Sequence, residues 1–356
     1  MTKRLASIDA LRGFDMLWII GGTGLVGALA EATNWRLFRW MESQSEHVEW
    51  NGFTLYDLIF PLFLFLAGVS MPFSIAQRLA RGDTRRALLL HAVRRALLLV
   101  LLGCLYNGLL RLDLENQRYA SVLGRIGLAW LGAALITLHT SVRGQVLWLV
   151  GILLGYWAVL TLVPVPGAGA GDLSPGRTLA DYLDRQFLPG RLHRGDRDPE
   201  GLLSTVPAVG TALLGVLAGH LLRRDLAERA KLLRLVLWGL FCLGAGGLWS
   251  LVFPLNKNLW TSSFVLWCGG ASLLLLALFH AVVDVLGRER WATFLIVIGT
   301  NAITVYLLEA FVDWWALVTL VLNENALHPA ILWAAVIGAQ WSLLYVLHRK
   351  RIFLRV

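Results

Sequence analysis

Long apolar stretches separated by short polar segments recur along the whole chain. Runs such as LLLVLLGCLYNGLL and SLLLLALFHAVV show no alternation of apolar and polar residues, which the strands of a membrane β-barrel would require. A helix needs about 20 mostly apolar residues to cross a bilayer. The pattern therefore predicts ten membrane-spanning helices, at residues 14–30, 54–77, 89–110, 122–140, 145–163, 204–222, 234–253, 261–286, 292–312 and 329–347.

The composition indicates a protein that is largely embedded in lipid. Apolar residues make up 57% of the 356 residues and charged residues 15%, against about 45–50% and 25% in soluble domains. This composition excludes intrinsic disorder. Cys104, Cys242 and Cys268 lie inside predicted spans without ligand-like spacing, so neither a disulfide framework nor a metal site is predicted. We expect an all-α, polytopic membrane helical bundle that forms a single domain over residues 1–356.

The basic residues predict the orientation of this bundle. The net charge is +9, and most of the 32 lysines and arginines lie in every second segment between spans. By the positive-inside rule these segments face the cytoplasm, and an even number of spans then places both termini there. The charge therefore requires no nucleic-acid partner. An alternative is that residues 14–30 belong to a signal segment ending at Ala28-Leu29-Ala30, although Asp15 interrupts its apolar stretch.

Two longer segments, residues 31–53 and 164–203, are predicted on the extracytoplasmic side, and long loops are often functional. Ionisable or amide groups inside spans are further candidates, because lipid tolerates them poorly. These groups are Asp15, Asp57, Asn107, Arg125, His280, Asp284, Asn301, Glu309 and Asp313. Each also has a structural interpretation: carboxylates near span ends can reach water, and His280 with Asp284 can form a structural pair. Arg125 can simply neutralise a carboxylate.

Two classes of function fit this pattern. A transporter would line a path with the polar residues, and an integral membrane enzyme would carry its chemistry on one face. The sequence contains no Walker loop, no dinucleotide-binding glycine motif and no H-E-x-x-H motif. An ATP-driven pump and a zinc protease are therefore not indicated.

Several motifs carry a family resemblance. The opening RLASIDALRGF resembles the R-x-x-S-x-D-x-x-R-G signature of several membrane acyltransferase families. HVEWNGFTLYDLIFPLFLFLAGVS is similar to the H-x-x-W-x-G-x-T-x-x-D-L-x-F-P segment of the heparan-α-glucosaminide N-acetyltransferase family and its bacterial relatives. VLGRIGLAW, DPEGLLSTVPAVG, PLNKNLWTSSFVL and VIGTNAITVYLLE agree in the same order. The resemblance therefore extends over nearly the whole chain.

The resemblance implies an activity and a location. The family transfers an acetyl group from cytosolic acetyl-CoA to the amine of a glucosamine on the other side of the membrane. Its bacterial relatives lie in the cytoplasmic (inner) membrane, and some are described as transporters of N-acetylglucosamine. The histidine of the H-x-x-W motif is the catalytic residue, which here is His47. Where the lysosomal enzyme has an active-site asparagine, this chain has Thr23, so the manner of holding the acceptor is expected to differ.

Roles for other residues follow as hypotheses. Asp57 would orient the imidazole of His47, which acts as a general base or carries the acetyl group transiently. Substrate-binding groups are expected among Trp50, Asn256, Asn258, Glu309 and Asn301. The CoA phosphates would be bound by Arg12, Arg78, Arg81, Arg85, Arg86 and Arg288, although the positive-inside rule requires such arginines in any case. The glycine- and tryptophan-rich spans are compatible with a homodimer as well as with a monomer.

Overall fold

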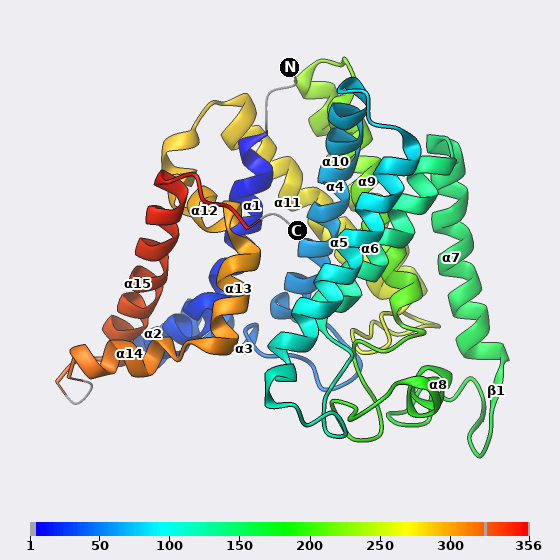
Figure 1. Cartoon of the computed structure of the whole chain (residues 1–356), viewed down its shortest axis with the longest axis horizontal. Helices are drawn as coiled ribbons and strands as arrows, with labels where there is room; N and C mark the ends of the chain where they lie inside the picture. Colours follow the sequence, from blue (N-terminus) through cyan, green and yellow to red (C-terminus); the bar gives the residue numbers. More distant parts are fainter. Residues whose placement is uncertain (1–4, 324–325, 355–356) are drawn as a thin grey trace. The chain divides into compact units, whose positions relative to one another are not determined.

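The computed structural model describes residues 5–323 and 326–354, which are almost entirely helical (Figure 1). Residues 1–4 and 355–356, into which the predicted cytoplasmic termini extend, lie outside this range. The helices are α1 (Ala6–Leu17), α2 (Thr23–Thr33), α3 (Arg36–Ser43), α4 (Ile59–Ala80), α5 (Arg85–Tyr106), α6 (Val122–His139), α7 (Val142–Leu162), α8 (Leu179–Phe187), α9 (Thr205–Arg223), α10 (Glu228–Trp249), α11 (Ser262–Phe279), α12 (Glu289–Thr300), α13 (Ala302–Phe311), α14 (Trp314–Val321) and α15 (Pro329–Arg349).

Shorter elements join these helices. π-Helical turns cover Trp18–Gly22 and His280–Val285, and 3-10 turns cover Leu55–Leu58 and Leu109–Arg111. The strands β1 (Pro164–Val165) and β2 (Gly169–Ala170) form a small antiparallel hairpin.

The number of spans agrees with the sequence pattern. In the described part of the chain, nine helical segments are long and apolar enough to cross a membrane, and the bent pair α12 and α13 brings the number to ten if it counts as one span. This confirms the polytopic all-α fold class. Two spans differ in detail. The first helical segment begins at Ala6, well before residue 14, and the predicted span 292–312 is two helices that meet at Asn301 with a bend of 58°.

The chain divides into two compact units. The first comprises the described parts of residues 1–48, 54–59 and 275–355, and the second comprises residues 49–53 and 60–274. The first unit therefore contains α1 to α3 and α12 to α15, and the second contains α5 to α10 and nearly all of α4.

Small residues allow the backbones of α1 and α12 to pack closely in the first unit. A Cβ atom at Gly13 would lie 1.8 Å from the carbonyl oxygen of Leu295, and one at Gly299 would lie 1.9 Å from that of Asp9. Neither position can therefore accept a side chain without moving a helix.

The start of α1 is held by the His280–Asp284 pair. Asp284 Oδ1 accepts a hydrogen bond from the backbone nitrogen of Ala6 at 3.0 Å, and Asp284 Oδ2 lies 2.9 Å from His280 Nδ1. A carboxylate in this position satisfies backbone donors that the first helical turn leaves unpaired. The structure thus supports the structural interpretation of this pair.

The second unit is built in the same way around α9. A Cβ atom at Gly215 would lie 2.0 Å from the carbonyl oxygen of Phe65, and one at Gly68 would lie 2.1 Å from that of Ala212, so α4 and α9 are in backbone contact. Within this unit α8 and the β1–β2 hairpin lie at one end, and the α4–α5 and α9–α10 connections lie at the other (Figure 1). The arginine-rich connections thus share one end of the unit, as the charge pattern predicts.

Candidate functional site

His47 and Asp57 form a directly bonded pair in the first unit. His47 lies in the loop after α3, and Asp57 lies in the 3-10 turn Leu55–Leu58 that precedes α4. Their Nδ1 and Oδ1 atoms are 2.8 Å apart, and the side chain of His47 is 50% exposed whereas that of Asp57 is 1% exposed. The exposed imidazole is therefore accessible to a substrate while its carboxylate partner is shielded.

The second oxygen of Asp57 is fixed by its local sequence. Thr54 and Asp57 form a capping box, in which Asp57 Oδ2 accepts hydrogen bonds from the Thr54 backbone nitrogen and hydroxyl, both at 3.1 Å. The Val48 nitrogen lies 3.5 Å from the same oxygen. The spacing T-x-x-D is a readable signal for such a box. The carboxylate is thus held in one orientation, with Oδ1 directed at the histidine.

This geometry determines what the imidazole can do. A carboxylate at Nδ1 favours the tautomer with its proton on that nitrogen, so that the lone pair is on Nε2. The Tyr56 ring packs against the imidazole with 4.6 Å between ring centroids, which further restricts its rotation. A histidine oriented in this way, with its lone pair on Nε2, is suited to general-base or nucleophilic catalysis.

Trp50, Asn256 and Asn258 lie in the second unit, where their donors are engaged. Trp50 Nε1 donates to the carbonyl oxygen of Leu173 at 2.8 Å. The fully buried Asn256 donates from Nδ2 to Asn51 Oδ1 at 3.1 Å, and Asn258 Nδ2 lies 3.4 Å from the Glu49 carbonyl oxygen. These bonds connect residues 49–53 to other parts of the second unit. Within this unit the three side chains therefore hold the backbone of residues 49–53 in place.

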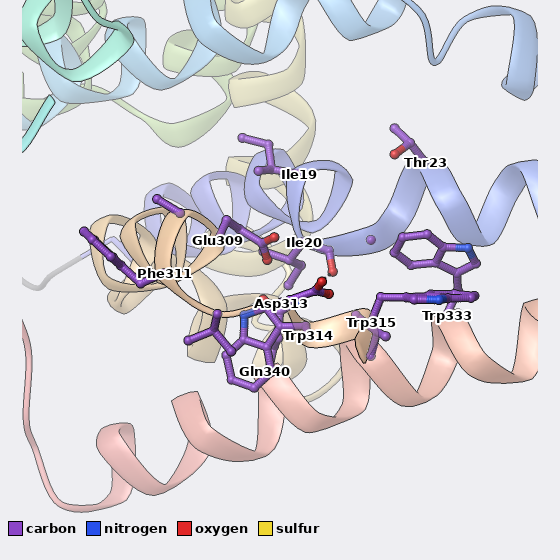
Figure 2. Close-up of a pocket in the computed structure, with 14 residues that line it drawn as sticks. Ile19, Ile20, Thr23, Glu309, Phe311, Asp313, Trp314, Trp315, Trp333 and Gln340 are labelled. Carbon is purple, nitrogen blue, oxygen red and sulfur yellow. Dashed lines mark hydrogen bonds between the residues drawn. The ribbon is translucent and has the colours of Figure 1, made fainter. Parts of the chain in front are cut away.

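A second group of candidate residues surrounds a cavity in the first unit (Figure 2). The cavity has a volume of about 520 Å³, and both Thr23 and Glu309 line it. Asn301 does not line it: this residue lies at the break between α12 and α13, where its Nδ2 donates to the Ile352 carbonyl oxygen at 3.3 Å. The structure therefore brings Glu309 and Thr23 to one site and leaves Asn301 at a hinge between helices.

Asp313, another candidate from the sequence, lines the same space. The sequence pattern did not identify Trp315, Trp333 and Gln340, which also line it. Trp333 and Gln340 are on α15, which reads as an ordinary span. The only sequence signal for a cavity here is the glycine pair in IIGGTG, where the first span loses its helical geometry: Gly21 has φ 125°.

The predicted CoA-binding arginines are distributed over both units. Arg78, Arg81, Arg85 and Arg86 lie at or beside the α4–α5 connection of the second unit, and Arg78 pairs with Asp83 at 2.9 Å. Arg12 and Arg288 belong to the first unit, at α1 and at the start of α12. Arg81, Arg85, Arg86 and Arg288 are exposed, so their guanidinium groups are accessible to an anion.

The second unit contains, around Asp198, a charge cluster that the sequence pattern did not predict. Arg118 binds Asp198 through two hydrogen bonds of 2.8 and 2.6 Å and also contacts Glu200. Close by, the Asp184 carboxylate accepts a hydrogen bond from the Leu202 nitrogen at 2.8 Å. Burial raises the pKa of Asp184 to about 7, and the neighbouring Asp198 charge acts in the same direction. Arg118 is 80 positions from Asp198 in the sequence, so no local spacing of residues predicts that they pair.

Arg125 is buried in the second unit beside this cluster. Its side chain is 2% exposed and contacts the Ser204 hydroxyl through Nη2. Its guanidinium lies 5.0 Å from the centroid of the Trp260 ring, a distance typical of a cation–π interaction. The buried Nε and Nη1 atoms of Arg125 have no hydrogen-bond partner in the described structure, so its role as structural or functional stays open.

The arrangement of residue types that ligate metals is a further property of the described residues. Among residues 5–323 and 326–354, no group of three or more histidine, cysteine, aspartate or glutamate side chains is arranged to hold a metal ion.

Comparison with known proteins finds two similar curated enzymes. No protein-family model matches the chain. The chain is 29% identical to heparan-alpha-glucosaminide N-acetyltransferase of Homo sapiens over 422 aligned positions, which cover 100% of this chain and 60% of the human protein. The protein of the same name from Mus musculus is 29% identical over 374 positions, which cover 87% of this chain and 56% of the mouse protein. The chain thus spans less than two thirds of the length of these relatives, and its similarity to the human protein extends from one end of the chain to the other.

Proposed function

We propose that this chain is a multi-pass membrane N-acetyltransferase that transfers the acetyl group of acetyl-CoA to the amine of a glucosamine-type sugar. The similarity to N-acetyltransferases over the whole chain supports the reaction type. The observation that carries the proposal is the His47–Asp57 pair, at the position where the family resemblance implies a catalytic histidine.

The proposed reaction needs a base. An amino-sugar amine is partly protonated near neutral pH, and only the neutral amine attacks a thioester. In direct transfer the amine nitrogen bonds to the acetyl carbonyl carbon, the C–S bond breaks, and CoA leaves as a thiolate. His47 Nε2 takes the proton that the amine loses and returns it to the thiolate. In the alternative, the imidazole first accepts the acetyl group from CoA and then passes it to the amine.

The proposed arrangement crosses the membrane. We place His47 and residues 31–53 and 164–203 on the extracytoplasmic face, with both termini in the cytoplasm and the protein in a bacterial cytoplasmic membrane. The two compact units together would form one acyltransferase domain. Arginines of the predicted set would bind the CoA phosphates from the cytoplasm, and the exposure of Arg81, Arg85, Arg86 and Arg288 supports this role.

The activity can be tested with the purified full-length chain in liposomes. Labelled acetyl-CoA and glucosamine should yield labelled N-acetylglucosamine. His47→Ala should lower kcat at least 100-fold, since general-base groups contribute about 10²–10⁴-fold. His139→Ala is the matched control because His139 is an exposed histidine whose Nδ1 lies 2.8 Å from the carbonyl oxygen of Leu135 in its own helix. Full activity of His47→Ala would refute the assignment.

The two chemical routes give different labelling patterns. With labelled acetyl-CoA and no acceptor, the acyl-enzyme route predicts label on the wild-type protein and none on His47→Ala. Direct transfer predicts no label on either protein. In oriented liposomes, acetylation should require glucosamine and acetyl-CoA on opposite faces.

A transporter of N-acetylglucosamine is the second candidate. The observation that favours it is the pair of broken spans in the first unit, at Gly21 and at Asn301, because discontinuous helices line substrate sites in many transporters. Uptake of labelled N-acetylglucosamine into CoA-free liposomes, without acetyl transfer, would support this function and contradict the enzyme.

A further inference from the structure

The cavity of the first unit is centred on a defect in a membrane-spanning helix. Between α1 and α2 the backbone leaves helical geometry at Ile20 and Gly21, and Gly21 adopts φ 125°, a conformation that favours glycine. Both residues line the cavity. The carbonyl oxygen of Ile20 accepts a hydrogen bond from Gln340 Nε2 of α15 at 2.9 Å, so a side chain of another helix satisfies backbone exposed by the break.

The ionisable groups of this cavity are all acidic. Glu309, near the end of α13, and Asp313, which precedes α14, both line it, and no lysine, arginine or histidine is among its lining residues. Figure 2 shows their carboxylates directed into the same space, close to Ile20. A carboxylate in a membrane-spanning segment is costly without a counter-charge. The lining residues supply no cation, and the cavity is therefore suited to a ligand that does.

Buried polar atoms without partners line the same space. Gln340 is 1% exposed, and its Oε1 has no hydrogen-bond partner in the described structure. The same holds for Glu309 Oε1 and Trp314 Nε1. Buried polar groups are normally paired. One donor and two acceptors on residues that line the cavity match a ligand that carries both hydroxyl and amine groups.

Aromatic rings complete the cavity. Trp315 and Trp333 lie side by side, with 4.7 Å between ring centroids, and both line it. Tryptophan faces attract cations and present a flat apolar surface. A bare metal ion would not need this surface, and among the described residues no three side chains are arranged to hold a metal. The chemistry fits a protonated amine carried on a small ring with hydroxyl groups.

We propose that this cavity is a recognition site for the protonated acceptor amino sugar, in which Glu309 pairs with the ammonium group and the tryptophans cover the sugar ring. The inference rests on the proposed acetyltransfer function and adds to it a device for selectivity. The ammonium group gives up its proton before acetylation, and the product is a neutral amide, so the cavity retains the substrate and releases the product. Glu309 is thus a specificity residue, distinct from the base His47.

The test is equilibrium binding to the purified full-length protein in lipid nanodiscs, without CoA. Labelled glucosamine, N-acetylglucosamine and glucose are the probes. We expect glucosamine to bind at least tenfold more tightly than the two neutral sugars. Glu309→Gln should raise the Kd for glucosamine at least tenfold and leave the neutral sugars unchanged. Glu31→Gln is the control, since Glu31 is an exposed carboxylate of α2 that does not line the cavity.

Asp313 provides a second variant that preserves the local fold. Its Oδ1 accepts a hydrogen bond from the Ala316 nitrogen at 2.9 Å and so caps α14. Asparagine is an equally good cap. Asp313→Asn should therefore weaken glucosamine binding with little change in unfolding temperature. Equal binding of the three sugars, or unchanged glucosamine binding in both cavity variants, would overturn the inference.

Acetyl transfer distinguishes failure of this inference from failure of the proposed function. If the wild-type protein acetylates glucosamine and Glu309→Gln keeps the same KM, the recognition site is wrong and the enzyme stands. If the wild-type protein binds glucosamine selectively but acetylates no amine, the proposed enzyme is wrong, and the cavity is a sugar-binding site of another function.

Discussion

Replacing Asp57 by asparagine is the sharpest test of the proposed chemistry, because it changes one atom of a buried side chain. Asp57 Oδ2 is occupied by the Thr54 backbone nitrogen and hydroxyl, and Oδ1 faces His47 Nδ1 at 2.8 Å. An asparagine that keeps its oxygen on Thr54 must direct its NH₂ group at the histidine. The imidazole then accepts at Nδ1 and carries its proton on Nε2, where no base remains.

The size of this effect follows from the role of the base. Loss of a general base costs about 10²–10⁴-fold in rate, which corresponds to about 3–5 kcal/mol of transition-state stabilisation. We expect kcat to fall within that range while the KM for acetyl-CoA changes little, because the substitution leaves substrate contacts in place. The altered cap should cost at most about 1 kcal/mol in stability.

The assay is steady-state acetylation of glucosamine by the purified protein, with thermal unfolding measured in parallel. Asp113→Asn is the matched control, since Asp113 is exposed and accepts hydrogen bonds from nearby Asn116. If Asp57→Asn retains more than half of the wild-type kcat with an unchanged fold, the carboxylate does not orient a catalytic histidine. The proposed role of the pair would then be wrong.

Three other predictions concern stability and CoA binding. Since burial raises the pKa of Asp184 to about 7, the free energy of unfolding should fall by up to about 4 kcal/mol as pH rises from about 4 to 7. Asp184→Asn should reduce the difference between the free energies of unfolding measured at pH 5 and at pH 8. An unchanged difference would contradict this prediction. Gly299→Val should lower the unfolding temperature, because its Cβ would lie 1.9 Å from a backbone oxygen of α1, whereas Gly244→Val, with open space around it, should not; equal unfolding temperatures would disprove the close packing. The double substitution of Arg85 and Arg86 by alanine should raise the KM for acetyl-CoA several-fold at constant kcat, and an unaltered KM would exclude these arginines from phosphate binding.

The spans were predictable because hydropathy directly reports what contacts lipid. A residue such as Phe241, which is 73% exposed in the protein, has to be apolar if lipid surrounds it, and this requirement is visible without any knowledge of packing. The end points were less accurate where a helix continues past its apolar part. Charged residues in α1, including Asp9 and Asp15, are buried in the first unit, so a hydropathy window begins the span later than the helix does.

The candidate site was only partly predictable, for a different reason. His47 and Asp57 are ten positions apart, and Asp57 belongs to a local capping motif with Thr54, so their pairing follows from nearby sequence. Glu309 is apparent as an isolated carboxylate in an apolar stretch. Its surroundings are not apparent, because Gln340 and Trp333 come from a helix that reads as an ordinary span. Which face of α15 meets the first span depends on tertiary packing, and a single sequence does not encode that in a local pattern.

The broken first span links these observations physically. A continuous helix would pair all its backbone groups and would present only side chains to its neighbours. The break at Ile20 and Gly21 frees a carbonyl oxygen, which lipid cannot satisfy, and Gln340 is the side chain that binds it. Once an amide is needed on α15, the surrounding space is polar, and a carboxylate such as Glu309 can be accommodated there at lower cost than against lipid. The same glycine that interrupts the helix therefore creates the conditions for a polar binding site inside a membrane-spanning unit.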